Sequence, residues 1–133
     1  MGYDFKNNQK EEKIMEMSRS YILHCARSLP NIGDKHICSK LHGHTFSISI
    51  CLKGNIDSNS GMIMDIYELD KIFNEKIHSK LDHSHLNEID GLSNPTTEYL
   101  VIWIWETLKP HIKQLHTVTG SEEKGTKFKY FGK

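Results

Sequence analysis

The sequence predicts an α+β fold in which two helices cover one face of an antiparallel sheet. Three observations support it: apolar and polar residues alternate over 42–53, residues 66–80 have helical spacing, and residues 94–98 carry a helix-start signal. Because strands and helices come in separate runs, an antiparallel sheet is favoured over a parallel one. The 133 residues suit one domain, so we expect a polar tail at 1–17 and a single domain at 18–133.

The clearest strand is predicted over residues 42–53. Its even positions are histidines followed by apolar residues, whereas its odd positions are mostly small or polar. Alternation with a period of two places the two sets on opposite faces of a sheet. His42 and His44 are therefore expected to point in the same direction, toward the apolar side.

The other elements are predicted from spacing and turn residues. A weaker alternation predicts the first strand, and the turn residues at 54–61 predict a hairpin loop. An apolar stripe predicts a helix over 66–80, and a second helix is expected to run from the start signal to about Lys109. The expected order is β-β-β-α-α-β-β, with strands at 18–27, 42–53, 61–65, 115–121 and 126–131.

Composition limits the partners and the location. Seventeen basic and 17 acidic residues give a formal net charge of zero, so no nucleic acid and no anionic membrane is expected as a partner. No apolar run has the length of a membrane span, and residues 1–6 lack the apolar stretch of a signal peptide. A cytoplasmic location follows. The three cysteines lack paired spacing, which argues against a disulfide framework.

The first pattern that indicates chemistry is His42-Gly43-His44. Two imidazoles on one face of a strand can bind the same metal ion, and zinc is commonly held by three protein ligands when a position stays open for substrate. Burying both imidazoles without a ligand is unfavourable. The alternative is a pair of half-buried histidines with backbone partners, and the pattern alone leaves both interpretations open.

Three further groups are candidates for chemistry. Cys38 lies four residues before His42 and becomes a usable base or nucleophile if a cation or metal lowers its pKa; the alternative is a small apolar filler. In Asp82-His83 the carboxylate can orient the imidazole, or both can belong to a polar loop. Glu122 can grip a guanidine-like ligand edge, or lie in a solvated turn.

Together, these segments resemble the 6-pyruvoyltetrahydropterin synthase / 6-carboxytetrahydropterin synthase family. Each motif is weak by itself, but their common order and spacing make the resemblance specific. It extends from about residue 20 to residue 132. The matching stretches are 38–44, 61–65, 81–83, 86–87, 94–98 and 122–132.

The resemblance implies a T-fold (tunnelling fold), in which trimers form an oligomeric β-barrel and two trimers stack into a homohexamer. It implies a small-molecule pterin substrate, dihydroneopterin triphosphate, and Zn²⁺ as cofactor. The implied roles are zinc ligation by His42 and His44, catalysis by the Cys38 thiol with Asp82 and His83 as its proton relay, anchoring of the pterin ring by Glu122, and lining of its pocket by Thr96 and Thr97.

The three-residue spacer between Cys38 and His42 resembles the carboxy-forming branch of the family. That branch implies a zinc-dependent carbon–carbon lyase that forms 6-carboxytetrahydropterin, with release of acetaldehyde and triphosphate, on the route to queuosine and other deazapurines. The alternatives are the pyruvoyl-forming activity, a pterin-binding member with an impaired zinc site, and a structural subunit.

Arg27 departs from the family pattern. An ungapped match puts it where the family has its third zinc-ligating histidine, and a permanently protonated guanidinium cannot ligate zinc. His24 is the expected replacement, although three residues place it on the other face of a regular strand, so a bulge would be needed. The alternatives are His36, a two-histidine site with added water, and a metal-free site in which Arg27 holds substrate phosphate.

Overall fold

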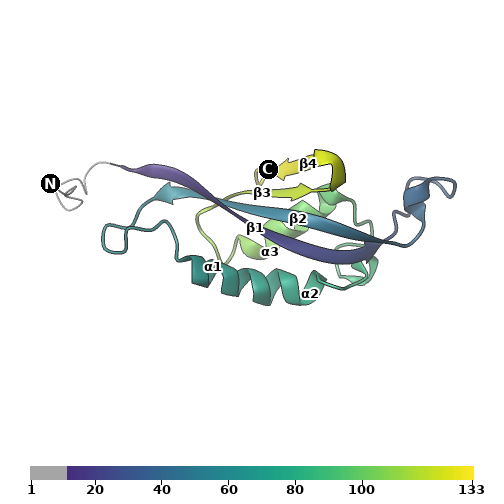
Figure 1. Cartoon of the computed structure of the whole chain (residues 1–133), viewed down its shortest axis with the longest axis horizontal. Coiled ribbons are helices and arrows are strands. Elements are labelled where there is room, and N and C mark those ends of the chain that lie inside the picture. The colour runs from purple at the N-terminus through teal and green to yellow at the C-terminus, as the bar shows by residue number, and fades with distance from the viewer. Residues whose placement is uncertain (1–11) are drawn as a thin grey trace.

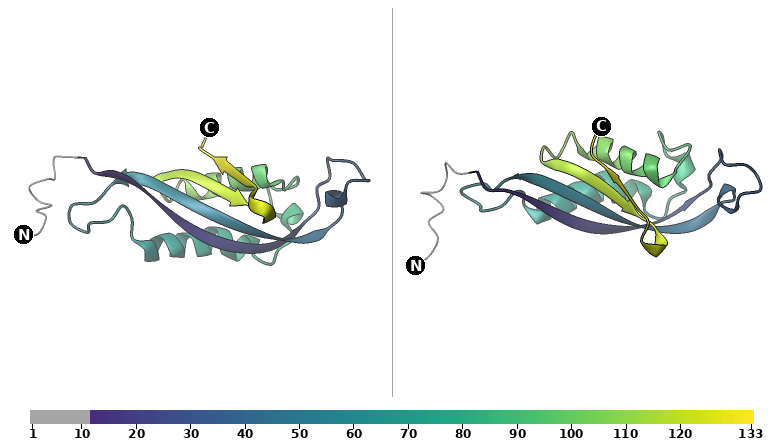
Figure 2. Two further views of the ribbon diagram at one scale, coloured as in Figure 1. Left: turned by 45° about the horizontal axis from the view of Figure 1, so that its top comes forward. Right: turned by 90° about the horizontal axis from the view of Figure 1, so that it is seen from above.

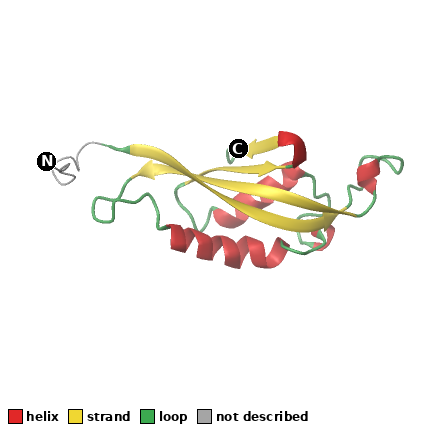
Figure 3. Ribbon diagram, in the orientation of Figure 1, coloured by secondary structure: helices red, strands yellow, loops and turns green. Residues whose placement is uncertain are grey.

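Four antiparallel strands form one sheet in the order β1-β2-β3-β4, with helices packed along it (Figures 1 and 3). The structure, a computed structural model, describes residues 12–133. This confirms the predicted α+β class. The strands are β1 (Ile14–Arg27), β2 (His42–Asn55), β3 (Leu115–Ser121) and β4 (Lys127–Tyr130).

A long helical segment follows the β1–β2 hairpin. It begins as α1 (Ile66–Phe73), continues through a π-helical turn, η2 (Asn74–His78), and ends as α2 (Ser79–Leu81). The second long helix is α3 (Thr97–Leu108), and short 3₁₀ turns lie at η1 (Ile37–Ser39), η3 (Leu86–Glu88) and η4 (Glu123–Gly125). No helix among the described residues combines the length and the apolar character that crossing a bilayer requires.

The structure corrects one predicted strand boundary and one predicted strand. The first strand begins at Ile14, so residues 14–17 belong to the sheet, while residues 1–11 of the expected tail lie outside the described residues. The predicted strand at 61–65 is wrong. Gly61 has φ 74° and donates its N–H to the Asp57 carbonyl, so the chain turns back there. Asp65 then caps α1 by accepting the Tyr67 N–H.

The core lies between the sheet and the helices. Alternate side chains of β2 are fully buried, and they meet a helical stripe from α1 to α2 and one side of α3. Each such side chain contributes on the order of 2 kcal/mol by leaving water. The central buried residues are Leu23, Phe46, Ile48, Ile50, Leu69, Phe73, Ile77, Leu100 and Ile104.

A close approach at Gly120 positions one end of α3 against β3. A Cβ built at Gly120 would lie 2.7 Å from Val101 Cγ1 and 3.0 Å from Thr97 Cγ2. Glycine therefore lets the first turn of α3 approach the β3 backbone. This contact brings Thr97 close to Glu122, which follows β3 directly.

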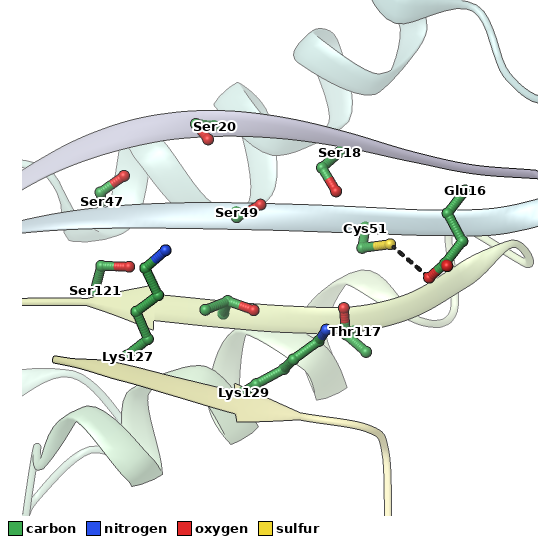
Figure 4. A pocket seen from close by; sticks show the side chains of 11 residues that line it. Glu16, Ser18, Ser20, Ser47, Ser49, Cys51, Thr117, Ser121, Lys127 and Lys129 are labelled. Atoms are coloured by element: carbon green, nitrogen blue, oxygen red, sulfur yellow. Dashed lines mark hydrogen bonds between the residues drawn. The ribbon is translucent and has the colours of Figure 1, made fainter. Parts of the chain in front are cut away.

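The opposite face of the sheet is polar. Hydroxyl side chains from β1, β2 and β3, with two lysines of β4, line a shallow groove of about 670 Å³ (Figure 4). Among the strands described, β1 and β4 are the edges. Figure 2 shows that the segment 28–41, with η1, projects beyond the end of the β1–β2 hairpin. The residues that line the groove are Glu16, Ser18, Ser20, Ser47, Ser49, Cys51, Thr117, Thr119, Ser121, Lys127 and Lys129.

Candidate functional site

A buried charged cluster lies at the end of β1. The Arg27 side chain is only 5% exposed, and its Nη2 donates to Glu122 Oε1 over 2.9 Å. Its Nη1 donates to the Pro95 carbonyl and to Thr97 Oγ1, both at 3.1 Å. Thr97 Oγ1 also donates to Glu122 Oε1. Three segments remote in sequence thus meet around one guanidinium.

The two histidines of β2 lie on the same side of the sheet as Arg27. In the β1–β2 register, Arg27 is opposite His42 and Cys25 is opposite His44, and directly opposed residues share a face. The imidazole centroids of His42 and His44 are 6.0 Å apart. His42 Nδ1 is 2.8 Å from the Lys40 carbonyl, whereas His44 Nε2 is buried and makes no hydrogen bond to the described residues.

Burial and neighbouring groups shift the pKa values of two side chains in this cluster. Burial lowers the pKa of His44 below its ordinary value, and the positive charge of Arg27 lowers it further, so the imidazole is neutral near pH 7. Burial alone would raise the pKa of Glu122, but hydrogen bonds from Thr97 and Arg27 outweigh it and lower that pKa. The cluster therefore holds an ionised carboxylate beside a neutral imidazole.

Asp82 and His83 follow α2 and are bonded to the backbone of His24, near the C-terminal end of β1. Asp82 Oδ1 accepts the backbone N–H of His24 at 2.9 Å, and the His83 N–H donates to the His24 carbonyl. Asp82 Oδ2 lies 2.9 Å from His83 Nδ1 and 3.4 Å from His78 Nε2. The His24 N–H bond is the main cause that lowers the pKa of Asp82, with His78 and His83 adding to it.

His83 has an unusual backbone conformation. Its φ of 58° lies in the left-handed region, which few non-glycine residues adopt, although asparagine, aspartate and histidine do so more often than others. Such conformations cluster at functional sites. The side chain is 79% exposed. The structure thus presents a carboxylate-oriented imidazole to solvent, an arrangement suited to proton transfer.

Cys38 lies on η1, in the projecting segment. Its N–H donates to His36 Nδ1 at 3.1 Å, and its carbonyl accepts the Leu29 N–H. Its side chain is half-buried, whereas Cys25 and Cys51 are buried. Within the described part of the chain, no hydrogen bond or ion pair joins Cys38 to Asp82 or His83.

The structure brings some of the expected site residues together and separates others. Arg27, Thr97 and Glu122 meet, whereas Thr96 caps α3 by accepting the Tyr99 N–H at 3.2 Å. His24 does not join His42 and His44. It is opposite Thr45, whose Oγ1 is 3.1 Å from its Nδ1, on the other face of the sheet.

The residues present do not fit the zinc site that the resemblance implies. The β1–β2 pairing is regular from Ile14 to Arg27, with no bulge that would turn His24 inward. Over residues 12–133, no three His, Cys, Asp or Glu side chains are arranged to share one ion. Two imidazoles are available, but the position opposite His42 holds a guanidinium, which has no free electron pair to donate to a metal ion.

Two features of the cluster escaped the sequence analysis. One is the pairing of Arg27 with Glu122, and the other is the Pro95 carbonyl as a further acceptor for Arg27. A buried arginine needs a carboxylate partner, so its position among apolar neighbours was a usable signal. The identity of that partner, 95 positions away, carries no local signal.

Comparisons with known proteins agree with the resemblance. A profile of the family described as 6-pyruvoyl tetrahydropterin synthase matches residues 16–133. A 6-carboxy-5,6,7,8-tetrahydropterin synthase of Synechocystis is 30% identical over 118 residues, which are 85% of this chain and 90% of that protein. A 6-pyruvoyl tetrahydrobiopterin synthase of Dictyostelium discoideum is 40% identical over 79 residues, which are 57% of this chain but only 58% of that protein.

A solved structure also resembles this fold. The 6-pyruvoyl tetrahydropterin synthase of Caenorhabditis elegans superposes with a TM-score of 0.82 at 26% identity, over 92% of this chain and 98% of that chain. The four-stranded sheet with its two long helices is therefore the T-fold of these proteins. With a family profile that covers all but the first 15 residues, this chain belongs to the 6-pyruvoyl tetrahydropterin synthase family.

Proposed function

We propose that the chain is a pterin-processing lyase that converts 7,8-dihydroneopterin triphosphate and one water to 6-carboxy-5,6,7,8-tetrahydropterin, acetaldehyde and triphosphate. The observation that carries the proposal is the ionised, oriented carboxylate of Glu122 at the end of β3. The carboxy-forming Synechocystis relative, aligned over most of both chains, favours this product. The product would enter deazapurine biosynthesis, including that of queuosine.

Glu122 suits the guanidine-like edge of a pterin, which offers two parallel N–H donors. A carboxylate has about four acceptor positions, two on each oxygen. Arg27 and Thr97 both donate to Oε1, and Oε2 has no partner among the described residues. A ligand edge can therefore bind on the Oε2 side, where charge-assisted bonds are strong.

The proton transfers are assigned to Cys38 and His83. The redox-neutral rearrangement requires protons to leave and return at carbon and oxygen atoms of the substrate side chain. Asp82, 2.9 Å from His83 Nδ1, holds that ring with Nε2 directed outward. Because Cys38 and His83 are not in contact within one chain, we propose that neighbouring copies bring them to one substrate.

This assembly is proposed to be a barrel of three chains, paired into a hexamer. Among the strands of residues 12–133, β1 and β4 each have a neighbour on one side only, and closing a sheet into a barrel removes such edges. The polar groove would then line the inside (Figure 4). Light scattering coupled to size exclusion should give six chains per particle; a monomer at micromolar concentration would refute the barrel.

The activity is tested by incubating the purified chain with 7,8-dihydroneopterin triphosphate. Acetaldehyde and 6-carboxytetrahydropterin in equal amounts are expected, and Cys38→Ala should abolish their formation. Cys51→Ala is the matched control, because Cys51 lies on the groove face, away from the cluster. Substrate consumption that Cys38→Ala leaves unchanged would contradict the proposed role of the thiol.

The pyruvoyl-forming activity is a second candidate, supported by the names of the Dictyostelium and Caenorhabditis relatives. The same incubation separates the two, because a pyruvoyl product forms without acetaldehyde. Ligand binding without either product would instead indicate a pterin-binding member of the family.

A further inference from the structure

We infer that Arg27 has replaced the third zinc ligand with a built-in cation, so that this site works without a tightly bound metal and Glu122 is positioned by a guanidinium. The inference starts from the residues present: two histidines and an arginine lie where the family resemblance implies three zinc-ligating histidines. The metal part of the inference stands whether or not the proposed reaction is correct.

The strand register identifies position 27 as the missing ligand position. Arg27 is directly opposite His42, and its side chain enters the same side of the sheet as both imidazoles. A histidine at position 27 would face the pair across a single strand spacing. His24 cannot do this, because it lies on the other face beside Thr45.

Arg27 is fixed rather than mobile. Its guanidinium donates to the Pro95 carbonyl, Thr97 Oγ1 and Glu122 Oε1. Its Cζ lies 5.0 Å from the centre of the Phe46 ring, in the range of a cation–π contact. To leave room for an ion, the side chain would have to give up all these contacts and leave Glu122 without its cationic partner.

The charge of Arg27 also opposes a metal ion. Phe46, on which the guanidinium rests, has its ring centre 4.6 Å from that of His44. A divalent ion bound to His44 would therefore lie on the same side of the sheet as a permanent, buried positive charge, and the repulsion between two such charges is screened less than in bulk water. The missing donor and the repulsion both act against zinc.

The same guanidinium acts on Glu122 as a positioning residue. Arg27 and Thr97 occupy both acceptor positions of Oε1. The carboxylate is thereby held in one rotamer, with Oε2 directed away from them. We expect ligands with a guanidine-like edge to require this arrangement.

The test is zinc and cobalt binding by the wild-type chain and by Arg27→His. After dialysis against zinc and then buffer, elemental analysis should find far less than one zinc per wild-type chain. Arg27→His should retain about one. The zinc affinity of Arg27→His should exceed that of the wild type by more than about 100-fold. A change of that size is larger than the effect of an outer-shell partner, so it would indicate a direct ligand. With Co²⁺, only Arg27→His should show the intense visible absorption of a tetrahedral site.

Two matched variants separate the causes. Arg27→Met keeps an unbranched, largely apolar side chain but removes the charge, without supplying the imidazole of Arg27→His. It should bind zinc no more than about tenfold more tightly than the wild type, less than a restored ligand supplies. Combining Arg27→His with His44→Ala should abolish the gained zinc. Circular dichroism establishes that each variant is folded.

The outcomes are decisive in either direction. Stoichiometric zinc in the wild-type chain, lost on His44→Ala, would overturn the inference even if Arg27→His does not fold. A folded Arg27→His variant that gains no zinc would overturn position 27 as the ligand position. Pterin binding to the metal-free wild type, measured by calorimetry with neopterin, tests the proposed function separately.

Discussion

Arg27 Nη2 donates a hydrogen bond to Glu122 Oε1 over 2.9 Å. This bond connects the last residue of β1 with the residue that follows β3. The arginine is almost fully buried, whereas the carboxylate side chain is 25% exposed. A buried guanidinium without an anion is costly, so removing either partner of this pair should destabilise the folded chain. An ion pair thereby connects β1 and β3 at the end of the sheet where the candidate site lies.

Glu122→Gln should destabilise the chain by about 1–3 kcal/mol, because a neutral amide leaves the Arg27 charge uncompensated. The midpoint of urea unfolding should fall while its slope is unchanged. Glu123→Gln is the control, since Glu123 is exposed and its substitution should change little. Equal midpoints for the two variants would show that the pair contributes nothing.

Stability should decrease in acid through Glu122. The folded state lowers the pKa of this carboxyl below its ordinary value of 4.5. Its contribution is therefore complete above about pH 5 and is lost as the pH falls through the folded-state pKa. Urea midpoints between pH 7 and pH 3 should drop less in Glu122→Gln than in the wild type; parallel curves would contradict the assignment.

Cys38 should be the first cysteine to be alkylated. Burial, with the nearby negative charge of Asp82, raises the pKa of Cys25 to about 12, so almost no reactive thiolate forms there at pH 8. Cys38, on η1, is only half-buried, whereas Cys25 and Cys51 are buried. Peptide mass spectrometry after brief iodoacetamide treatment should place the first adduct on Cys38, and Cys38→Ala should lack it. An earlier adduct on Cys25 would contradict the described packing.

Asp82→Asn should lower turnover by about 100-fold or more, because His83 loses the carboxylate that orients it. Asparagine can still accept the His24 N–H, so the fold should be retained. His78→Ala is the control: His78 also approaches Asp82, at 3.4 Å, but has no assigned role. If both variants lose activity equally, Asp82 acts through its general charge rather than through His83.

The sequence predicted most of the elements because their signals are local. The alternation in β2 placed His42 and His44 on one face, and the start signal predicted at 94–98 contains Thr96, the cap of α3. The segment 61–65 failed because its apolar residues imitate a strand, while Gly61 turns the chain.

The candidate site was harder to predict, because its contacts are remote in sequence. Thr97 meets Glu122 only because Gly120 lets α3 approach β3. The odd spacing between His24 and Arg27 did indicate that they lie on opposite faces, which the regular register bears out. No local pattern, however, could assign a partner to the Arg27 guanidinium.

The outer edges of β1 and β4, which have no partner strand in the described part of the chain, also bear on how the proposed assembly would resist heat. If β1 of one copy pairs with β4 of the next, the folded state gains backbone hydrogen bonds only in the assembly. Folding and association then become one equilibrium governed by mass action. The apparent melting temperature should therefore rise with protein concentration. Dilution alone should lower it, with the sequence and the solvent unchanged.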